Sequence, residues 1–127
     1  MPFLTELNSV IMDRMVLRDY LSAMDSGDPV KVLELLEPDF SFLIALPGRE
    51  VTGRSKEDFA AYLAGRAAAD RVHHVLRYAA DGDVETVYGR VTDGDATTGW
   101  FHSAAVVSPG GRMARYQSFF STTFELV

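Results

Sequence analysis

Cysteine is absent from the 127 residues of this chain. Its absence excludes disulfide bonds, thiolate nucleophiles and metal sites built on cysteine. Long apolar runs are missing too, since no segment approaches the roughly 18 residues that a membrane-spanning helix needs. Glu6, Asp13 and Arg14 interrupt the apolar pattern of the N-terminus, which is unlike a secretory signal peptide. We therefore expect a cytoplasmic protein with no membrane partner.

Basic residues are scarce relative to acidic ones. The chain has 12 Lys and Arg against 18 Asp and Glu, a formal net charge of −6 at pH 7. This balance argues against nucleic-acid binding, which depends on a basic face that neutralises phosphates. Hydrophobic residues make up 47% and charged residues 24%, which is typical of a globular protein. Length and composition predict a single domain over residues 1–127.

Sequence motifs for metals and cofactors are missing as well. The chain has no HExxH, GxSxG, phosphate-loop or GxGxxG pattern. Two of its three histidines are adjacent, so on a strand they would point to opposite faces and could not share a metal ion. We expect neither a metal nor an organic cofactor.

The first half of the sequence has the period of helices. Apolar residues recur three and four positions apart from Leu7 to Met24, with Thr5 as the N-cap. An Asp-Pro start predicts a second helix over Val30–Leu36. A third helix is predicted from Ser55 to about Ala69.

The second half has the period of strands, interrupted by Asp-Gly and Gly-Gly turns. An early strand is predicted at Phe40–Ile44, before the third helix. The later strands are predicted at Val72–Ala80, Val84–Thr92, Thr97–Val107 and Arg112–Phe124. Consecutive hairpins form an antiparallel sheet, and the helices are the elements available to cover one of its faces. The sequence therefore predicts an α+β fold.

This order of elements resembles the nuclear-transport-factor-2-like superfamily, and within it the SnoaL-like and scytalone-dehydratase-like branch. The most specific part is the segment Tyr-Leu-Ser-Ala-Met-Asp-Ser-Gly-Asp at residues 20–28, followed by Pro38-Asp39. The superfamily also includes ketosteroid isomerases. The resemblance implies a cone-shaped roll, with three N-terminal helices packed on a strongly curved, mainly antiparallel sheet around one internal pocket.

The resemblance also implies a catalytic pair. Residues 24–28 are similar to the aspartate motif of scytalone dehydratase, and residues 72–75 to its histidine motif, which implies Asp25 and His74. Such a pair performs general acid–base catalysis, with the carboxylate orienting the imidazole. Tyr20 falls at the position of the oxyanion-hole tyrosine of the ketosteroid isomerases. Each residue also has a structural reading, as a turn carboxylate, a core histidine and a core aromatic.

Alternation along the predicted strand Val72–Ala80 favours His74 over His73 as the pocket residue. Val72, His74, Leu76 and Tyr78 share one face, which carries more bulk and no permanent charge. The other face carries Arg77. We therefore assign the face of His74 to the pocket.

Some functional residues of the relatives have no counterpart. The general-base carboxylate of the ketosteroid isomerases corresponds to Ile44, and their second oxyanion acid to Ser103. The water-positioning tyrosines of scytalone dehydratase correspond to Met24 and Ile44. Steroid isomerisation by the relatives' mechanism is therefore not expected.

Helix and strand faces together predict the pocket wall and the opposite surface. The predicted wall consists of Tyr20, Leu21, Met24, Phe42, Ile44, Phe59, Leu63, His74, Leu76, Phe101 and Ser103, with Tyr78 as a weaker candidate. Trp100 and His102 would lie on the outer sheet face, where a second copy of the chain would cover them in a homodimer. A one-residue bulge would instead turn these two side chains into the pocket.

The expected ligand is a small apolar or polycyclic molecule. We expect a dehydratase, cyclase or isomerase acting on a hydroxy-ketone or polycyclic substrate. The alternative is a non-catalytic ligand-binding or dimerisation module of the same fold. Arg49, Arg54 and Arg66 could bind an anion at the pocket mouth, although solvated surface arginines are commoner.

Overall fold

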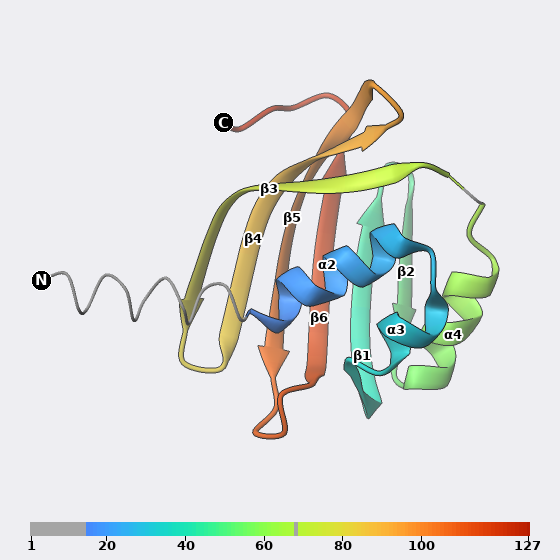
Figure 1. The fold of residues 1–127 in the computed structure, drawn as a ribbon, viewed down its shortest axis with the longest axis vertical. Helices are drawn as coiled ribbons and strands as arrows, with labels where there is room; N and C mark the ends of the chain where they lie inside the picture. Colours follow the sequence, from blue (N-terminus) through green and yellow to red (C-terminus); the bar gives the residue numbers. More distant parts are fainter. Residues whose placement is uncertain (1–14, 68) are drawn as a thin grey trace, which may run out of the picture.

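Three helices lie against one face of a six-stranded sheet in the computed structural model, which describes residues 15–67 and 69–127 (Figure 1). The helices are α2 (Val16–Ser26), α3 (Pro29–Leu33) and α4 (Lys56–Ala64). The strands are β1 (Leu36–Leu46), β2 (Arg49–Gly53), β3 (Arg71–Asp81), β4 (Val84–Asp93), β5 (Ala96–Val107) and β6 (Met113–Ser121).

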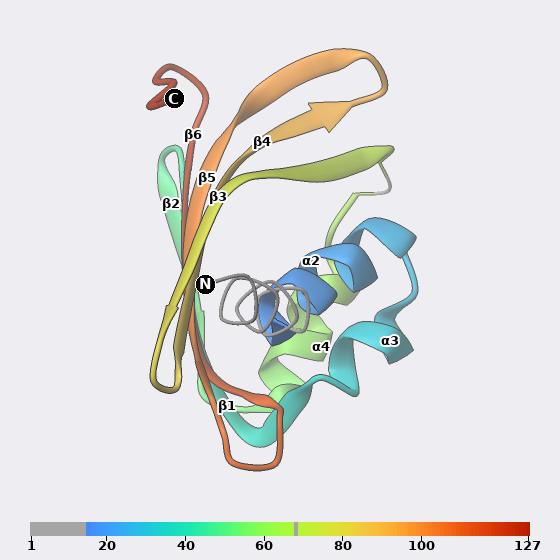
Figure 2. The same cartoon turned by 60° about the vertical axis from the view of Figure 1, so that its left-hand side comes forward.

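The sheet is mainly antiparallel and open. Its strand order is β2-β1-β6-β5-β4-β3, and only the β1–β6 pair is parallel among the described strands. One end of β3, β4 and β5 curls over the helices, so the sheet has a concave face that α2, α3 and α4 cover (Figure 2). The predicted α+β roll of three helices on a strongly curved sheet is confirmed.

The first described helix starts later than the sequence predicted. Met15 has extended backbone angles, so α2 begins at Val16. The predicted N-cap Thr5 and the start of the apolar pattern at Leu7 lie outside the described residues. Glu85 of β4 supplies the cap instead, because its Oε1 accepts the backbone N–H of Leu17 at 2.8 Å.

The other helix starts follow the predicted caps. Asp28 Oδ1 accepts the Val30 N–H at 3.0 Å, and Ser55 Oγ accepts the Asp58 N–H at 3.0 Å. Both helices end earlier than predicted, α3 at Leu33 and α4 at Ala64. Helix α3 ends early because β1 begins soon after it, and the first residue of β1 already pairs with β6.

Strand β2 was not predicted, because its residues were interpreted as a loop. It is short and lies at the sheet edge, and it pairs only with β1 among the described strands. Such an edge strand has no strong alternation of its own, so its pairing with β1 defines it.

Aromatic side chains form the core between the sheet and the helices. Tyr20 of α2 and Phe59 of α4 pack against Phe40, Phe42 and Tyr116 of the sheet. Phe59 is fully buried and meets the Phe42 ring edge-on, with the ring centroids 5.0 Å apart. Such pairs add roughly 0.5–1.5 kcal/mol each beyond their buried area. In the described part of the chain, no helix is long and apolar enough to cross a membrane.

The backbones of neighbouring strands approach closely at Gly89 of β4. This residue pairs with Val75 of β3 and with Phe101 of β5. A Cβ atom at position 89 would lie 2.1 Å from the carbonyl oxygen of His74 and 2.7 Å from the Phe101 ring. A backbone carbonyl cannot move away as a flexible side chain can, so the position requires glycine.

We expect Gly89→Ala to lower the free energy of unfolding by about 1–3 kcal/mol or more, because the added methyl overpacks the sheet. Gly65→Ala is the matched control, since its Cβ would meet nothing closer than 3.7 Å. It should change stability by no more than about 0.5 kcal/mol. Urea unfolding measures both variants. Equal effects of the two substitutions would contradict the steric argument.

Candidate functional site

A cavity of about 770 Å³ lies between the concave sheet face, α2 and α4. Its wall includes six of the residues that the sequence predicted, namely Tyr20, Leu21, Met24, Phe42, Ile44 and Phe101. Leu46, Val51, Val91 and Phe120 extend the apolar surface. The wall is therefore mostly hydrocarbon and aromatic, as expected for a site that holds an apolar ligand.

Five of the predicted residues lie elsewhere. Phe59 is buried in the aromatic core, and Leu63 lines a smaller pocket among the helices. Ser103 is 1% exposed and contacts the cavity only through its hydrogen-bond partners. The remaining two, His74 and Leu76, do not line the cavity.

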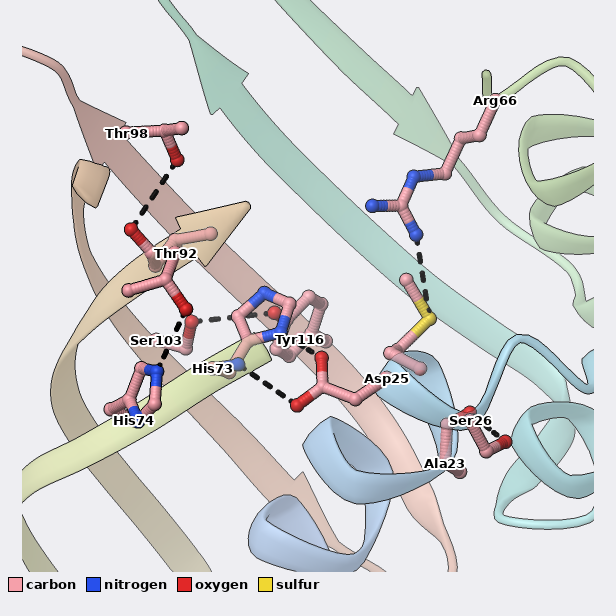
Figure 3. A network of polar contacts seen from close by, with 12 residues as sticks. Ala23, Asp25, Ser26, Arg66, His73, His74, Thr92, Thr98, Ser103 and Tyr116 are labelled. Carbon is pink, nitrogen blue, oxygen red and sulfur yellow. Dashed lines mark hydrogen bonds and ion pairs between the residues drawn. The ribbon is translucent and has the colours of Figure 1, made fainter. Parts of the chain in front are cut away.

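The histidine that meets Asp25 is His73. Its Nδ1 lies 2.5 Å from Asp25 Oδ1, and its backbone N–H donates to Asp25 Oδ2 at 2.8 Å (Figure 3). Both side chains are mostly buried, with 15% of His73 and 18% of Asp25 exposed. The carboxylate thus joins the last turn of α2 to the start of β3, 48 residues further along the chain.

His74 was predicted as the partner of Asp25, and this assignment is wrong. Its Nε2 lies 2.9 Å from Thr92 Oγ1, on the convex face of the sheet (Figure 3). Val72, which shares its face, is 40% exposed, and His74 itself is partly exposed. The strand therefore presents the opposite histidine to the cavity.

A β-bulge explains the wrong assignment. The register between β3 and β4 shifts between Val75 and Arg77, so Leu76 is the extra residue. Beyond the bulge, Tyr78 shares the concave face with His73, and the Arg18 guanidinium of α2 lies 5.1 Å from its ring centroid. Tyr78 does lie on the concave face, to which the sequence analysis assigned it. Because the bulge adds one residue to β3, strict alternation from Tyr78 back to the two histidines placed each histidine on the wrong face. Tyr78 itself does not line the cavity.

The contacts of His73 define the tautomer of its neutral form. A carboxylate only accepts hydrogen bonds, so Nδ1 carries the proton, and in the neutral ring Nε2 has the lone pair. No group in residues 15–67 or 69–127 hydrogen-bonds to that Nε2. The ring lies edge-on to Phe101, with the centroids 5.1 Å apart, and lines the cavity. The imidazole therefore offers a basic nitrogen beside an apolar wall.

Hydroxyl groups line the wall next to this imidazole. Ser103 Oγ lies 3.3 Å from Tyr116 Oη and 2.8 Å from Ser118 Oγ, and both partners line the cavity. Burial raises the pKa of Tyr116 from its ordinary value, although its hydrogen bond with Ser103 acts in the opposite direction. Burial, and then the adjacent Tyr116, raise the pKa of Tyr20 well above its usual range. Both phenols therefore remain protonated donors at neutral pH.

Neither Tyr116 nor Ser118 was part of the pocket wall that the sequence predicted. The signal was present, because Tyr116, Ser118 and Phe120 alternate on one face of the last strand. Pairing of β6 with both β1 and β5 shows that this face is the concave one.

The structure places Trp100 and His102 on the convex face, as the preferred strand register predicted. Their neighbours Phe101 and Ser103 are buried on the other face. His102 Nε2 lies 3.2 Å from Thr86 Oγ1, across the outer surface. Among the described residues, no three metal-ligating side chains lie close enough together to hold a metal ion.

Comparison with known families supports the same assignment of the fold. The SnoaL-like domain family matches residues 17–121, which is most of the chain. The chain belongs to this family. No curated protein matches its sequence.

Solved structures of similar fold come from several bacteria. A candidate ketosteroid isomerase from Kribbella flavida is 22% identical with a TM-score of 0.69, and the match covers 90% of this chain and 81% of that one. An LEH-like epoxide hydrolase of M. tuberculosis is 16% identical with a TM-score of 0.68, covering 87% and 84%. IdmH of Streptomyces antibioticus, a candidate polyketide cyclase, is 17% identical with a TM-score of 0.67, covering 84% and 89%. These likenesses establish the shared fold, whereas the chemistry must come from the residues of the site.

We expect a double-mutant cycle between Asp25→Ala and His73→Ala to give a coupling energy of about 0.5–3 kcal/mol, because the two side chains share a charge-assisted hydrogen bond. In the matched cycle between Asp25→Ala and His74→Ala, the coupling energy should be less than about 0.5 kcal/mol. Urea unfolding of the single and double variants measures both. Stronger coupling to His74 than to His73 would contradict the observed contact.

Proposed function

We propose that this protein is a cofactor-independent enzyme of the dehydratase, cyclase or isomerase type, acting on a small hydroxy-ketone or polycyclic ketone. The observation that carries the proposal is the Asp25–His73 pair at the wall of an apolar cavity. Family membership alone does not identify the reaction, because one fold hosts many activities. His73 takes the role for which the sequence suggested His74.

The proposed chemistry is general acid–base catalysis at His73 Nε2. Asp25 accepts the Nδ1 proton and the backbone N–H, so it holds the ring in one orientation and stabilises the imidazolium. Nε2 takes a proton from the carbon next to a substrate carbonyl, and a carbon–carbon double bond forms as a β-hydroxyl leaves. The imidazolium then returns the proton to that hydroxyl, and the net change is loss of water.

Hydroxyl groups in the wall would polarise the substrate carbonyl. Tyr20 is the candidate that the sequence suggested, and Tyr116 and Ser118 extend the set. The raised pKa of both tyrosines supports a role as neutral hydrogen-bond donors. Met24 and Phe101 provide apolar wall where the body of the ligand would rest.

A deuterium-exchange experiment tests the proposal without knowledge of the natural substrate. The probes are 2-tetralone, a bicyclic ketone, and 4-hydroxy-2-butanone, a β-hydroxy-ketone, each incubated with the protein in heavy water and followed by NMR. We expect exchange of the hydrogens next to the carbonyl, which His73→Gln slows by about 10²-fold or more. His74→Gln, the matched control from the same strand, should leave the rate unchanged.

Two results would count against catalysis by this pair. One is exchange at the buffer rate with both probes, and the other is equal exchange in the two histidine variants. Either would favour the alternative, a non-catalytic ligand-binding or dimerisation module.

We also propose that the protein forms a homodimer through the convex sheet face around Trp100 and His102. Exposed apolar side chains support this, since Phe119 is 45% exposed and pairs directly with His102. The C-terminal segment contacts the same face, because the Leu126 N–H donates at 2.7 Å to the hydroxyl of Tyr88, which pairs with His102.

We expect light scattering to give the mass of a dimer for the unchanged protein and of a monomer for Phe119→Asp, because the substitution places a charge in the interface. Val30→Asp is the control, since Val30 is 59% exposed on α3, away from this face. It should remain dimeric. A monomeric parent protein would refute the proposal.

A further inference from the structure

Three arginines line the cavity of this otherwise acidic chain. They are Arg49 of β2, Arg66 after α4 and Arg71 of β3. The chain as a whole has a formal net charge of −6, so the cluster does not simply reflect its composition. The positive charges lie around a wall that is otherwise mostly apolar.

The two aspartates of the cavity wall already have backbone partners. Asp58 Oδ2 accepts the Arg54 N–H at 2.9 Å, and Asp93 Oδ1 accepts the Asp70 N–H at 3.3 Å. Neither lies within 4.0 Å of an arginine nitrogen, because the only ion pair within residues 15–67 and 69–127 joins His73 to Asp25. The described carboxylates therefore do not neutralise the arginines by direct contact.

Arg66 is the arginine best placed to bind an anion. Its side chain is partly buried, and its guanidinium carbon lies 5.7 Å from the Tyr62 ring centroid. The one hydrogen bond of its side chain to a described residue is a long contact of 3.9 Å from Nη1 to Met24 Sδ. A guanidinium has five N–H donors, so Arg66 keeps most of its hydrogen-bonding capacity in a fork that matches a carboxylate.

Arg66 also lies close to the proposed catalytic pair. The residue that its guanidinium contacts, Met24, directly precedes Asp25 in α2. Figure 3 shows Arg66 on one side of Asp25 and His73 of β3 on the other. Arg66 and His73 line the same cavity. A molecule held by Arg66 would therefore reach the imidazole.

We propose that the ligand of this cavity is an organic acid, whose carboxylate binds the guanidinium fork of Arg66 while its apolar body lies against the hydrophobic wall. The inference deepens the proposed function, and it rests on that function only in taking the cavity as the ligand site. The substrate would then be a keto or hydroxy acid, with its reacting carbon beside His73.

A singly charged carboxylate fits this cavity better than a phosphate. Asp58 and Asp93 line the same cavity, and their charges would repel a dianion more strongly than a monoanion. Arg71 already donates from Nη2 to the Ala67 carbonyl at 3.3 Å, which leaves it fewer donors for a larger anion. The charge distribution therefore favours a carboxylate.

Calorimetric titration with 2-naphthoate and 2-naphthamide tests the proposal, because the two probes share a bicyclic body and differ in charge. We expect the carboxylate to bind roughly tenfold to hundredfold more tightly than the amide, as a charge-assisted pair should. The difference should shrink as the salt concentration rises. Equal affinity for the two probes, or tighter binding of the amide, would overturn the proposal.

Variants then identify the group responsible. Arg66→Met removes the charge but keeps an apolar stem, and it should abolish the preference for the carboxylate. Arg54→Met is the control, because Arg54 does not line the cavity, and it should keep the preference. Loss of the preference in His73→Gln but not in Arg66→Met would overturn the assignment to Arg66. If Arg66→Met does not fold, the comparison of the two probes in the unchanged protein still decides.

A third probe separates the two anion chemistries. 2-Naphthyl phosphate should bind more weakly than 2-naphthoate, and tighter binding of the phosphate would overturn the choice of a carboxylate. Failure of the deuterium-exchange experiment would leave these binding results intact, because they do not depend on turnover by His73.

Discussion

The structure depends on one constraint, that a strongly curved open sheet cannot bury its own concave face. The curled strands β3 and β4 contain the close backbone approach at Gly89 and the bulge at Leu76, and a bulge bends and twists its strand. Helices must then cover the hollow, and α2 and α4 cover it through an aromatic cluster that includes Tyr20 and Phe59. The helices do not fill the whole hollow, and the space that they leave against the concave face is the cavity. The site is therefore a consequence of how the sheet bends.

The contact between Asp25 and His73 connects this architecture to chemistry. A carboxylate in the last turn of a helix faces the negative end of the helix dipole, which costs roughly 0.3–1 kcal/mol. Two N–H groups of His73 offset that cost, since hydrogen bonds to charged groups contribute about 1.5–3 kcal/mol each. The same contact orients the imidazole and leaves Nε2 for a ligand. A structural role and a catalytic role therefore use the same atoms, and only a comparison of stability with turnover separates them.

Features that depend on neighbouring residues could be predicted from the sequence. The caps at Asp28 and Ser55 and the turns at Gly82 and Gly94 follow from local backbone chemistry, and the structure has them where the sequence placed them. One part of the site that could not be predicted was the choice between two adjacent histidines. That choice depends on the bulge between β3 and β4, which is a property of strand pairing and leaves no mark in the alternation of one strand.

The sequence by itself determined the fold class and the positions of most elements, because periodicity, caps and turn residues act over a few positions. Asp25 as one half of the pair came instead from the resemblance of residues 24–28 to the aspartate motif of scytalone dehydratase. The tertiary structure decided which histidine faces Asp25, that Tyr116 and Ser118 join the wall, and that Arg66 enters the same cavity. These outcomes depend on pairing register and on the packing of α4 against the sheet. Such contacts join residues far apart in the chain. The alternation of Tyr116 and Ser118 shows that they share a face of β6, but only the pairing of β6 with β1 and β5 makes this face the concave one.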